Sequence, residues 1–326
     1  MKYIFALIIL SVIAVCVMFA TQFVGLGVLA ITTDTPFMEL ATKMQNINQY
    51  PELRTPILLL QGATQLFSFF AVAIFFAKYI YKNNQVEDNG AVHVMNPKMA
   101  QHFLEEPLLQ RYKTPVVIFL IVIGLAIIAF PAVWLTGALN GAVDFPDFLQ
   151  GLESWMREKE DQNQLLTLFM IDFATPLQAL LGFVVIAVIA GLCEEVFFRG
   201  VMQPIVQNLT KNKHAAVWIT AIIFSAIHFQ FYGFIPRMLL GALFGYLYVY
   251  TNNITVPIWA HILNNGITLA LTLSVGKDML NTPTLELGDL VTMIPLGVLS
   301  FLLCIGLLMF IKRIMDKAVA QNMNMK

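Results

Sequence analysis

GLCEEVFFRG, residues 191–200, places two adjacent carboxylates and one arginine inside an apolar run from about Leu180 to Ile205. Ionisable side chains in a membrane span are costly, so they usually mark a functional site. On a helix, Glu195 and Arg199 are i,i+4 neighbours with the glutamate first, the favourable order for an ion pair. On the same helix, the Glu194 side chain points about 100° away from that of Glu195 around the helix axis. We therefore expect Arg199 to hold Glu195 and Glu194 to face another partner. A purely structural ion pair would leave Glu194 unexplained.

The composition indicates a helical membrane protein. Of the 326 residues, 58% are hydrophobic and 12% are charged, whereas about 25% of a soluble domain is charged. The formal net charge of -1 argues against a nucleic-acid partner. The three cysteines lie in apolar runs, and their spacing is not typical of a zinc knuckle or a disulfide framework.

Apolar segments along the chain predict eight transmembrane helices. They cover residues 3–31, 57–81, 115–137, 177–209, 215–231, 238–251, 254–275 and 290–311. A short interfacial helix is expected at 97–109, and an amphipathic surface helix in the acidic segment 140–164. Gly241 and Gly245 have GxxxG spacing, which predicts close helix packing in the sixth segment. Lys and Arg gather in alternate loops and in the C-terminal tail, which predicts that both termini are cytoplasmic.

Four polar side chains in the apolar segments form a candidate site. Glu194 lies 17 residues before Lys211 and His228 lies 17 residues after it, so regular antiparallel helices put both at one depth. His261 follows the turn at Asn252 by nine residues, so it is expected about 12 Å nearer the cytoplasm. Helix tilt or a cavity would have to close that gap. His261 and Asn265 are i,i+4 neighbours on one helix face.

This set is sufficient for metal-free hydrolysis of a peptide bond. A carboxylate paired with histidine can deprotonate water, as Glu194 and His228 would. A second histidine and an amide, His261 and Asn265, can donate hydrogen bonds to an oxyanion. The rival chemistry is a zinc site with Glu194, His228 and His261 as ligands, completed by Asn265 or water. Taken singly, each histidine, and Asn264 or Asn265, also suits a hydrogen bond between helices.

The same residues form three motifs that resemble those of the CAAX prenyl protease and bacteriocin-processing family, also called the CPBP or Abi family. EExxxR corresponds to Glu194–Arg199, FxxxH to Phe224–His228 and HxxxN to His261–Asn265. They occur in this order in consecutive apolar segments, between about Leu177 and Leu273.

The resemblance implies an all-α intramembrane endopeptidase, a hydrolase with its active site in a cavity between helices that opens to the cytoplasm. The implied roles are water activation by Glu194 and His228, oxyanion binding by His261 and Asn265, and structural support by Glu195 and Arg199. No metal or other cofactor is implied, with zinc as the alternative. The implied substrate is a membrane-embedded or membrane-associated protein or peptide, which need not be prenylated.

We further expect an integral protein of the bacterial inner membrane, divided into three regions. These are N-terminal helices and loops (1–170), a catalytic core (171–275), and a last transmembrane helix with a basic cytoplasmic tail (276–326). Two other functions stay open: a non-catalytic bacteriocin-immunity or scaffold protein on the same fold, and a proton-coupled transporter. The complete set of four polar residues favours the enzyme, and the sequence shows no inverted repeat typical of transporters.

Overall fold

A computed structural model describes residues 2–81, 114–143, 145–276 and 287–324, and every regular element in these ranges is helical. The α-helices are α1 (Lys2–Thr32), α2 (Phe37–Gln45), α3 (Arg54–Gln65), α4 (Val72–Phe75), α6 (Val116–Ile128), α7 (Phe130–Gly141), α8 (Gln150–Ile171), α9 (Pro176–Phe183), α10 (Ala190–Phe197), α11 (Gln203–Thr210), α12 (Lys213–Ala226), α13 (Phe234–Thr251), α14 (Thr255–Val275) and α15 (Leu287–Asn324). π-Helical turns join several of them, so α9 to α11 form one continuous run.

Seven helical runs in the described ranges are long and apolar enough to cross a membrane. They are Tyr3–Thr32, Pro51–Lys78, Val116–Gly141, Pro176–Thr210, Phe234–Thr251, Thr255–Val275 and Val291–Ala318. The protein is therefore an all-α polytopic membrane protein, and each run corresponds to a segment predicted from the sequence. The predicted interfacial helix at 97–109 lies outside the described residues.

The fifth predicted span is shorter than expected, so the count of eight is not confirmed. Its helix, α12, has 14 residues and is about 21 Å long at 1.5 Å per residue. The chain turns after Ala226, where Phe229 takes a left-handed conformation with φ 51°. An apolar composition that continues to Phe231 gave no sign of this turn, and Ile227 and Phe229 remain exposed beside it.

The predicted amphipathic helix is α8, and it extends beyond the acidic segment to Ile171. The extension is apolar and ends against α3, where Phe169 is buried with Leu53 and Ile57. Arg54 satisfies the helix end, because its Nε donates to the Phe169 carbonyl at 2.8 Å. Its Nη2 also pairs with Asp172 at 2.7 Å.

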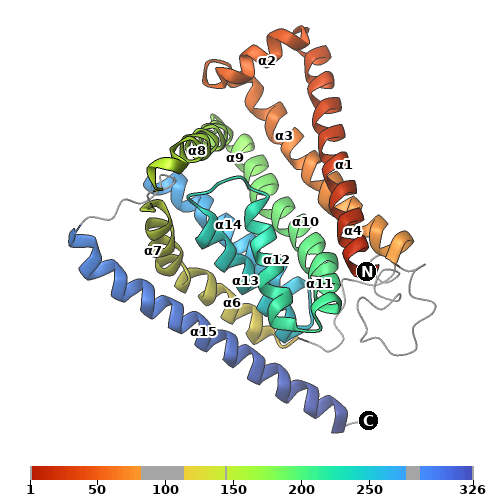
Figure 1. Ribbon diagram of the computed structural model, residues 1–326, viewed down its shortest axis with the longest axis vertical. Coiled ribbons are helices and arrows are strands. Elements are labelled where there is room, and N and C mark those ends of the chain that lie inside the picture. The colour runs from red at the N-terminus through yellow and green to blue at the C-terminus, as the bar shows by residue number, and fades with distance from the viewer. Residues whose placement is uncertain (1, 82–113, 144, 277–286, 325–326) are drawn as a thin grey trace.

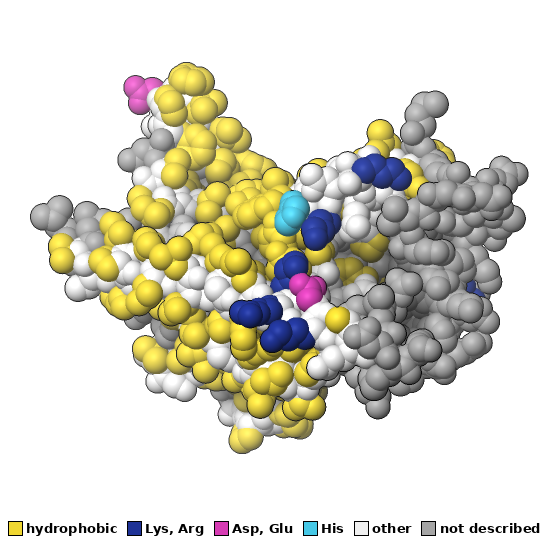
Figure 2. Space-filling model, turned by 90° about the horizontal axis from the view of Figure 1, so that it is seen from below, with side chains coloured by type: hydrophobic (Ala, Val, Ile, Leu, Met, Phe, Trp, Pro, Cys, Tyr) yellow, Lys and Arg dark blue, Asp and Glu magenta, His cyan; other side chains and the backbone are white. Residues whose placement is uncertain are grey.

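Different parts of the chain lie at the two ends of the bundle (Figure 1). Both chain termini and the turn between α11 and α12 lie at one end, and α2 and α8 lie at the other. Figure 2 looks onto the first end, where Lys and Arg side chains gather. We call it the basic end, and its exposed cationic residues are Lys211, Lys213, Lys312, Arg313 and Lys317. We call the opposite end the α8 end.

The GxxxG glycines pack as predicted, against α12. A Cβ on Gly241 would lie 3.3 Å from Ala221 Cα, and one on Gly245 would lie 3.0 Å from Val217 Cγ1. The buried backbone carbonyls of both glycines accept hydrogen bonds from the long α9–α11 run. Arg199 donates to Gly241 at 2.7 Å, and Gln203 donates to Gly245 at 3.3 Å. Close packing of α12 and α13 thus creates acceptors for two buried polar side chains.

Gly191→Ala is expected to lower stability, because α10 and α14 pack closely at Gly191. A Cβ there would lie 2.8 Å from Ile262 Cγ1 and 3.1 Å from the Ile262 backbone nitrogen. Overpacking of this kind costs about 1–3 kcal/mol, and here it also displaces the neighbour of His261. The matched control is Gly306→Ala in α15, where an added Cβ meets nothing within 4 Å. Thermal melting of purified protein checks this, and equal melting temperatures for both variants would contradict it.

Candidate active site

The two adjacent glutamates lie in different environments. Glu195 is fully buried, and its Oε1 accepts a hydrogen bond from Arg199 Nη1 at 2.7 Å. Glu194 is 7% exposed and lines a cavity. The side chains therefore diverge as the helix geometry predicts. The helix is not regular, since π-helical turns at Val184–Ile189 and Phe198–Met202 flank α10; such turns recur at functional sites.

Arg199 is enclosed completely, with 0% of its side chain exposed. Besides Glu195 and the Gly241 carbonyl, its guanidinium carbon lies 4.9 Å from the centre of the Phe224 ring and 5.6 Å from that of Phe244. A buried cation needs such partners because water is excluded. Phe224, the first residue of the FxxxH motif, is thus part of the arginine's surroundings.

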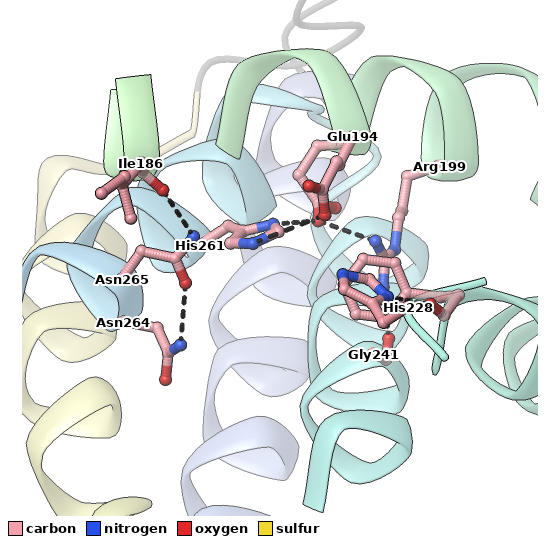
Figure 3. A network of polar contacts seen from close by, with 10 residues as sticks. Ile186, Glu194, Arg199, His228, Gly241, His261, Asn264 and Asn265 are labelled. Carbon is pink, nitrogen blue, oxygen red and sulfur yellow. Dashed lines mark hydrogen bonds and ion pairs between the residues drawn. The ribbon is translucent and has the colours of Figure 1, made fainter. Parts of the chain in front are cut away.

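His261 connects the two glutamates. Its Nδ1 lies 2.8 Å from Glu195 Oε1, and its Nε2 lies 3.9 Å from Glu194 Oε2. The ring stacks on Phe244 with centroids 4.9 Å apart. If Nδ1 carries the proton and donates to Glu195, then Nε2 faces Glu194 and the cavity. Glu195 therefore orients His261, a contact that the sequence did not reveal. In Figure 3, His261 and Glu194 point toward one another.

The expected displacement of His261, about 12 Å along the helix axis, is wrong. It assumed that the turn after α13 lies as near the membrane surface as the turn after α11. Instead, Ile254 is buried beside the long run, where its Cδ1 would lie 3.2 Å from a Cβ on Gly200. His261 follows Ile254 by seven residues, and Glu194 precedes Gly200 by six. Counting from this contact brings both side chains to the same depth.

His228 faces the same cavity from the turn after α12. Its Nδ1 lies 2.7 Å from the Phe224 carbonyl, an arrangement in which Nδ1–H donates and Nε2 keeps its lone pair. Within the described residues, Glu194 lies within ion-pair distance of His261 and not of His228. The predicted pairing of Glu194 and His228 is thus not a direct contact, although both side chains line one cavity.

Asn265 also lines the cavity and is fixed by two hydrogen bonds. Its Nδ2 donates to the Ile186 carbonyl at 3.1 Å, and its Oδ1 accepts from Asn264 Nδ2 at 3.2 Å. Ile186 lies in a π-helical turn, where the backbone ladder departs from its usual pattern. An amide nitrogen has two hydrogens, so one N–H of Asn265 is left for a ligand.

The cavity has a volume of about 500 Å³ and lies between α7, α8, α10, α13 and α14. Its wall includes the four predicted catalytic side chains, Glu194, His228, His261 and Asn265. A space of this size accommodates a few residues of an extended peptide. Part of its wall belongs to α8 and to the turn between α12 and α13, so the cavity lies toward the α8 end.

The sequence analysis did not single out three further polar side chains of the cavity: Glu160, Gln230 and Arg237. Arg237 lines the wall, and its Nη2 donates to Gln230 Oε1 at 2.5 Å. Glu160 of α8 accepts a hydrogen bond from the Tyr232 backbone nitrogen at 3.2 Å. Burial raises the pKa of the Glu160 carboxyl above its ordinary value, against the lowering effect of the Tyr232 hydrogen bond. A charged residue beside Pro236, at the start of an apolar span, was the available signal for Arg237.

The zinc alternative depends on how the candidate ligand side chains are placed. Among the residues that the structure describes, no group of three His, Cys, Asp or Glu side chains is placed to hold a metal ion. His228 stands apart from the group formed by Glu194, Glu195 and His261.

Comparisons with known proteins agree with the motifs. Residues 176–267 match the family model described as "Type II CAAX prenyl endopeptidase Rce1-like", and this segment contains all three motifs. The chain is also 29% identical over 86 residues to "Uncharacterized protein YpbD" of Bacillus subtilis (strain 168). That match covers 25% of this chain and 41% of the relative, so the chain spans less than half of the relative's length. No solved structure matches the chain. The resemblance predicted from the motifs is confirmed: residues 176–267 are similar to Rce1-like type II CAAX prenyl endopeptidases.

Proposed function

We propose that the protein is an intramembrane glutamic endopeptidase that hydrolyses a peptide bond of a membrane-embedded or membrane-associated protein or peptide. The observation that carries the proposal is the different use of the two glutamates. Glu195 is occupied by Arg199 and His261, whereas Glu194 faces the cavity with no hydrogen bond from another described residue. A general base needs such a carboxylate within reach of water and substrate.

In the proposed reaction, Glu194 and His228 hold the attacking water from two sides. His228 Nε2 accepts one hydrogen bond from the water, and the Glu194 carboxylate takes a proton as the water oxygen attacks the carbonyl carbon. The new C–O bond forms a tetrahedral oxyanion. Glu194 then returns its proton to the leaving nitrogen as the C–N bond breaks, giving a carboxylate and an amine.

The oxyanion would be stabilised from α14. Asn265 has one uncommitted N–H, and its amide is fixed by Ile186 and Asn264. His261 Nε2 points to the cavity, and in the protonated ring both nitrogens donate hydrogen bonds. Glu195 and Arg199 act as positioning residues, because Glu195 fixes the His261 ring and Arg199 fixes Glu195. Donors held in place in this way need no rearrangement during the reaction.

The proposed setting is the bacterial inner membrane with both termini in the cytoplasm. The basic end of the bundle supports this orientation, because Lys and Arg favour the cytoplasmic side of a membrane. The proposal includes no nucleic-acid partner. The protein's own lipid environment and a protein substrate held in the same bilayer are its proposed partners.

Removal of metal ions is expected to leave the activity intact. If Glu194 acts as the base without zinc, the enzyme in detergent keeps its turnover after dialysis against a strong chelator. Elemental analysis would then find far less than stoichiometric zinc. Inactivation that stoichiometric zinc reverses would contradict the glutamate mechanism and make Glu194, His228 and His261 candidate ligands.

The experiment that tests the function itself compares peptide termini in membranes of cells that contain the wild-type protein or Glu194→Gln. An endopeptidase produces termini in the first sample that are absent from the second. If the two samples have identical termini, while the wild-type protein remains necessary for a cellular phenotype, a non-catalytic immunity or scaffold role is supported instead.

A further inference from the structure

The basic end of the bundle has the charge pattern of a cytoplasmic face. Among the residues that the structure describes, five exposed cationic side chains lie there: Lys211, Lys213, Lys312, Arg313 and Lys317. The N-terminal helix reaches the same end, since Lys211 Nζ lies 5.7 Å from the centre of the Tyr3 ring. Lysine and arginine close to the ends of spans set the orientation of a membrane protein, with the richer side in the cytoplasm.

The cationic side chains at the α8 end are mostly neutralised. Lys43 pairs with Glu39 at 3.0 Å, Arg54 with Asp172 at 2.7 Å, and Arg157 with Glu153 at 2.6 Å. The helix α8 is itself acidic in sequence. At the basic end Lys312 also pairs, with Asp316 at 2.7 Å. Among the described residues, however, the α8 end has fewer exposed Lys and Arg side chains than the basic end, which is the pattern of an extracytoplasmic face.

The cavity lies in the half of the bundle away from the basic end. Glu194 precedes the end of α11 at Thr210 by 16 residues, about 24 Å of helix. Toward the α8 end, the cavity is lined by Glu160 and Gln164 of α8 and by Gln230 and Tyr232 of the turn after α12. Its polar wall thus extends from the predicted catalytic residues to the extracytoplasmic side.

Packed side chains separate the cavity from the basic end. Between Glu194 and that end lie Phe198, Arg199 and Gln203, each no more than 1% exposed. Val217 and Leu247 of the neighbouring helices are equally buried. The hydrogen bonds from Arg199 and Gln203 to Gly241 and Gly245 tie this layer together. A peptide coming from the basic end would have to break it.

From these observations we infer that the cavity opens to the extracytoplasmic side of the membrane. The site then takes peptide segments presented at the outer face, such as an exported peptide or the outer end of a membrane-anchored protein. This substrate class rests on the proposed endopeptidase function, whereas the sidedness does not. It also reverses the cytoplasmic opening implied by the resemblance, because that opening and cytoplasmic termini cannot both hold for this geometry.

Cysteine labelling in intact cells tests the sidedness without a substrate. The parent protein has Cys16, Cys193 and Cys304 replaced by alanine, and single cysteines are then introduced. Gln162→Cys reports the exposed surface of α8, Thr268→Cys the cavity wall, and Lys213→Cys the basic end. A membrane-impermeant maleimide is applied to intact cells and, in parallel, to permeabilised cells. Thermal melting confirms that each variant is folded.

We expect Gln162→Cys and Thr268→Cys to be labelled equally in intact and permeabilised cells, and Lys213→Cys to lose its labelling in intact cells. Labelling of Lys213→Cys from outside would overturn the proposal. So would a Thr268→Cys that reacts only after permeabilisation, or one that reacts in neither condition. The labelling is repeated with Glu194→Gln added, so that a failed enzyme assay and a failed sidedness are distinguished: the first leaves the labelling pattern unchanged.

Discussion

Glu194→Gln is expected to abolish peptide cleavage and to leave the protein folded. The amide keeps the size of the carboxylate but cannot accept the proton of the attacking water. General base catalysis contributes about 10²–10⁴ in rate, and here the same group also returns the proton to the leaving nitrogen. Glu194 lines the cavity and makes no hydrogen bond to another described side chain, and its ion-pair contact is the 3.9 Å approach to His261 Nε2, so the substitution breaks no hydrogen bond that holds the fold.

The matched control for this prediction is Glu195→Gln at the neighbouring position. Glu195 accepts hydrogen bonds from Arg199 and His261 and is fully buried. We therefore expect its replacement to lower the melting temperature and to lower activity through the misplaced His261 ring. Both variants are purified, melted and assayed by mass spectrometry on one substrate. A Glu194→Gln enzyme that cleaves normally, beside a folded and inactive Glu195→Gln enzyme, would reverse the assignment of the two glutamates.

The sequence predicted what depends on local spacing. The i,i+4 order of Glu195 and Arg199 predicted their pair, which the structure has at 2.7 Å. The GxxxG spacing of Gly241 and Gly245 predicted close packing, and both glycines lie against α12. Long apolar segments located the membrane-spanning runs, because the length of a span follows from the thickness of the bilayer.

The sequence did not predict what depends on contacts between distant segments. The depth of His261 is set by Ile254 packing beside Gly200, and no local pattern encodes that contact. The same holds for the hydrogen bond from Asn265 to Ile186, which lies in a π-helical turn. The end of α12 at Ala226 was missed because hydropathy does not distinguish an apolar turn from a helix that continues.

Arg199→Met is expected to be among the most destabilising single substitutions in this chain. Arg199 and Glu195 are each 0% exposed, and Arg199 is the cation paired with Glu195. Removing one partner of a buried ion pair costs about 3–5 kcal/mol, because the remaining charge is left without compensation. The Gly241 carbonyl loses its donor as well. A lower yield and a lower melting temperature in detergent should follow.

The double variant Arg199→Met with Glu195→Gln separates this cause from simple loss of packing. Once both charges are removed, no buried carboxylate is left alone, so the double variant should melt above Arg199→Met. Coupling energies between contacting residues are typically about 0.5–3 kcal/mol. The matched surface control is Arg313→Met, an exposed arginine of α15, for which a change within about 0.5 kcal/mol is expected. If Arg199→Met and Arg313→Met have the same melting temperature, the ion pair does not stabilise the bundle. If the double variant is the least stable of all, the cost lies in the lost contacts with Phe224 and Gly241, and the charge on Glu195 contributes little.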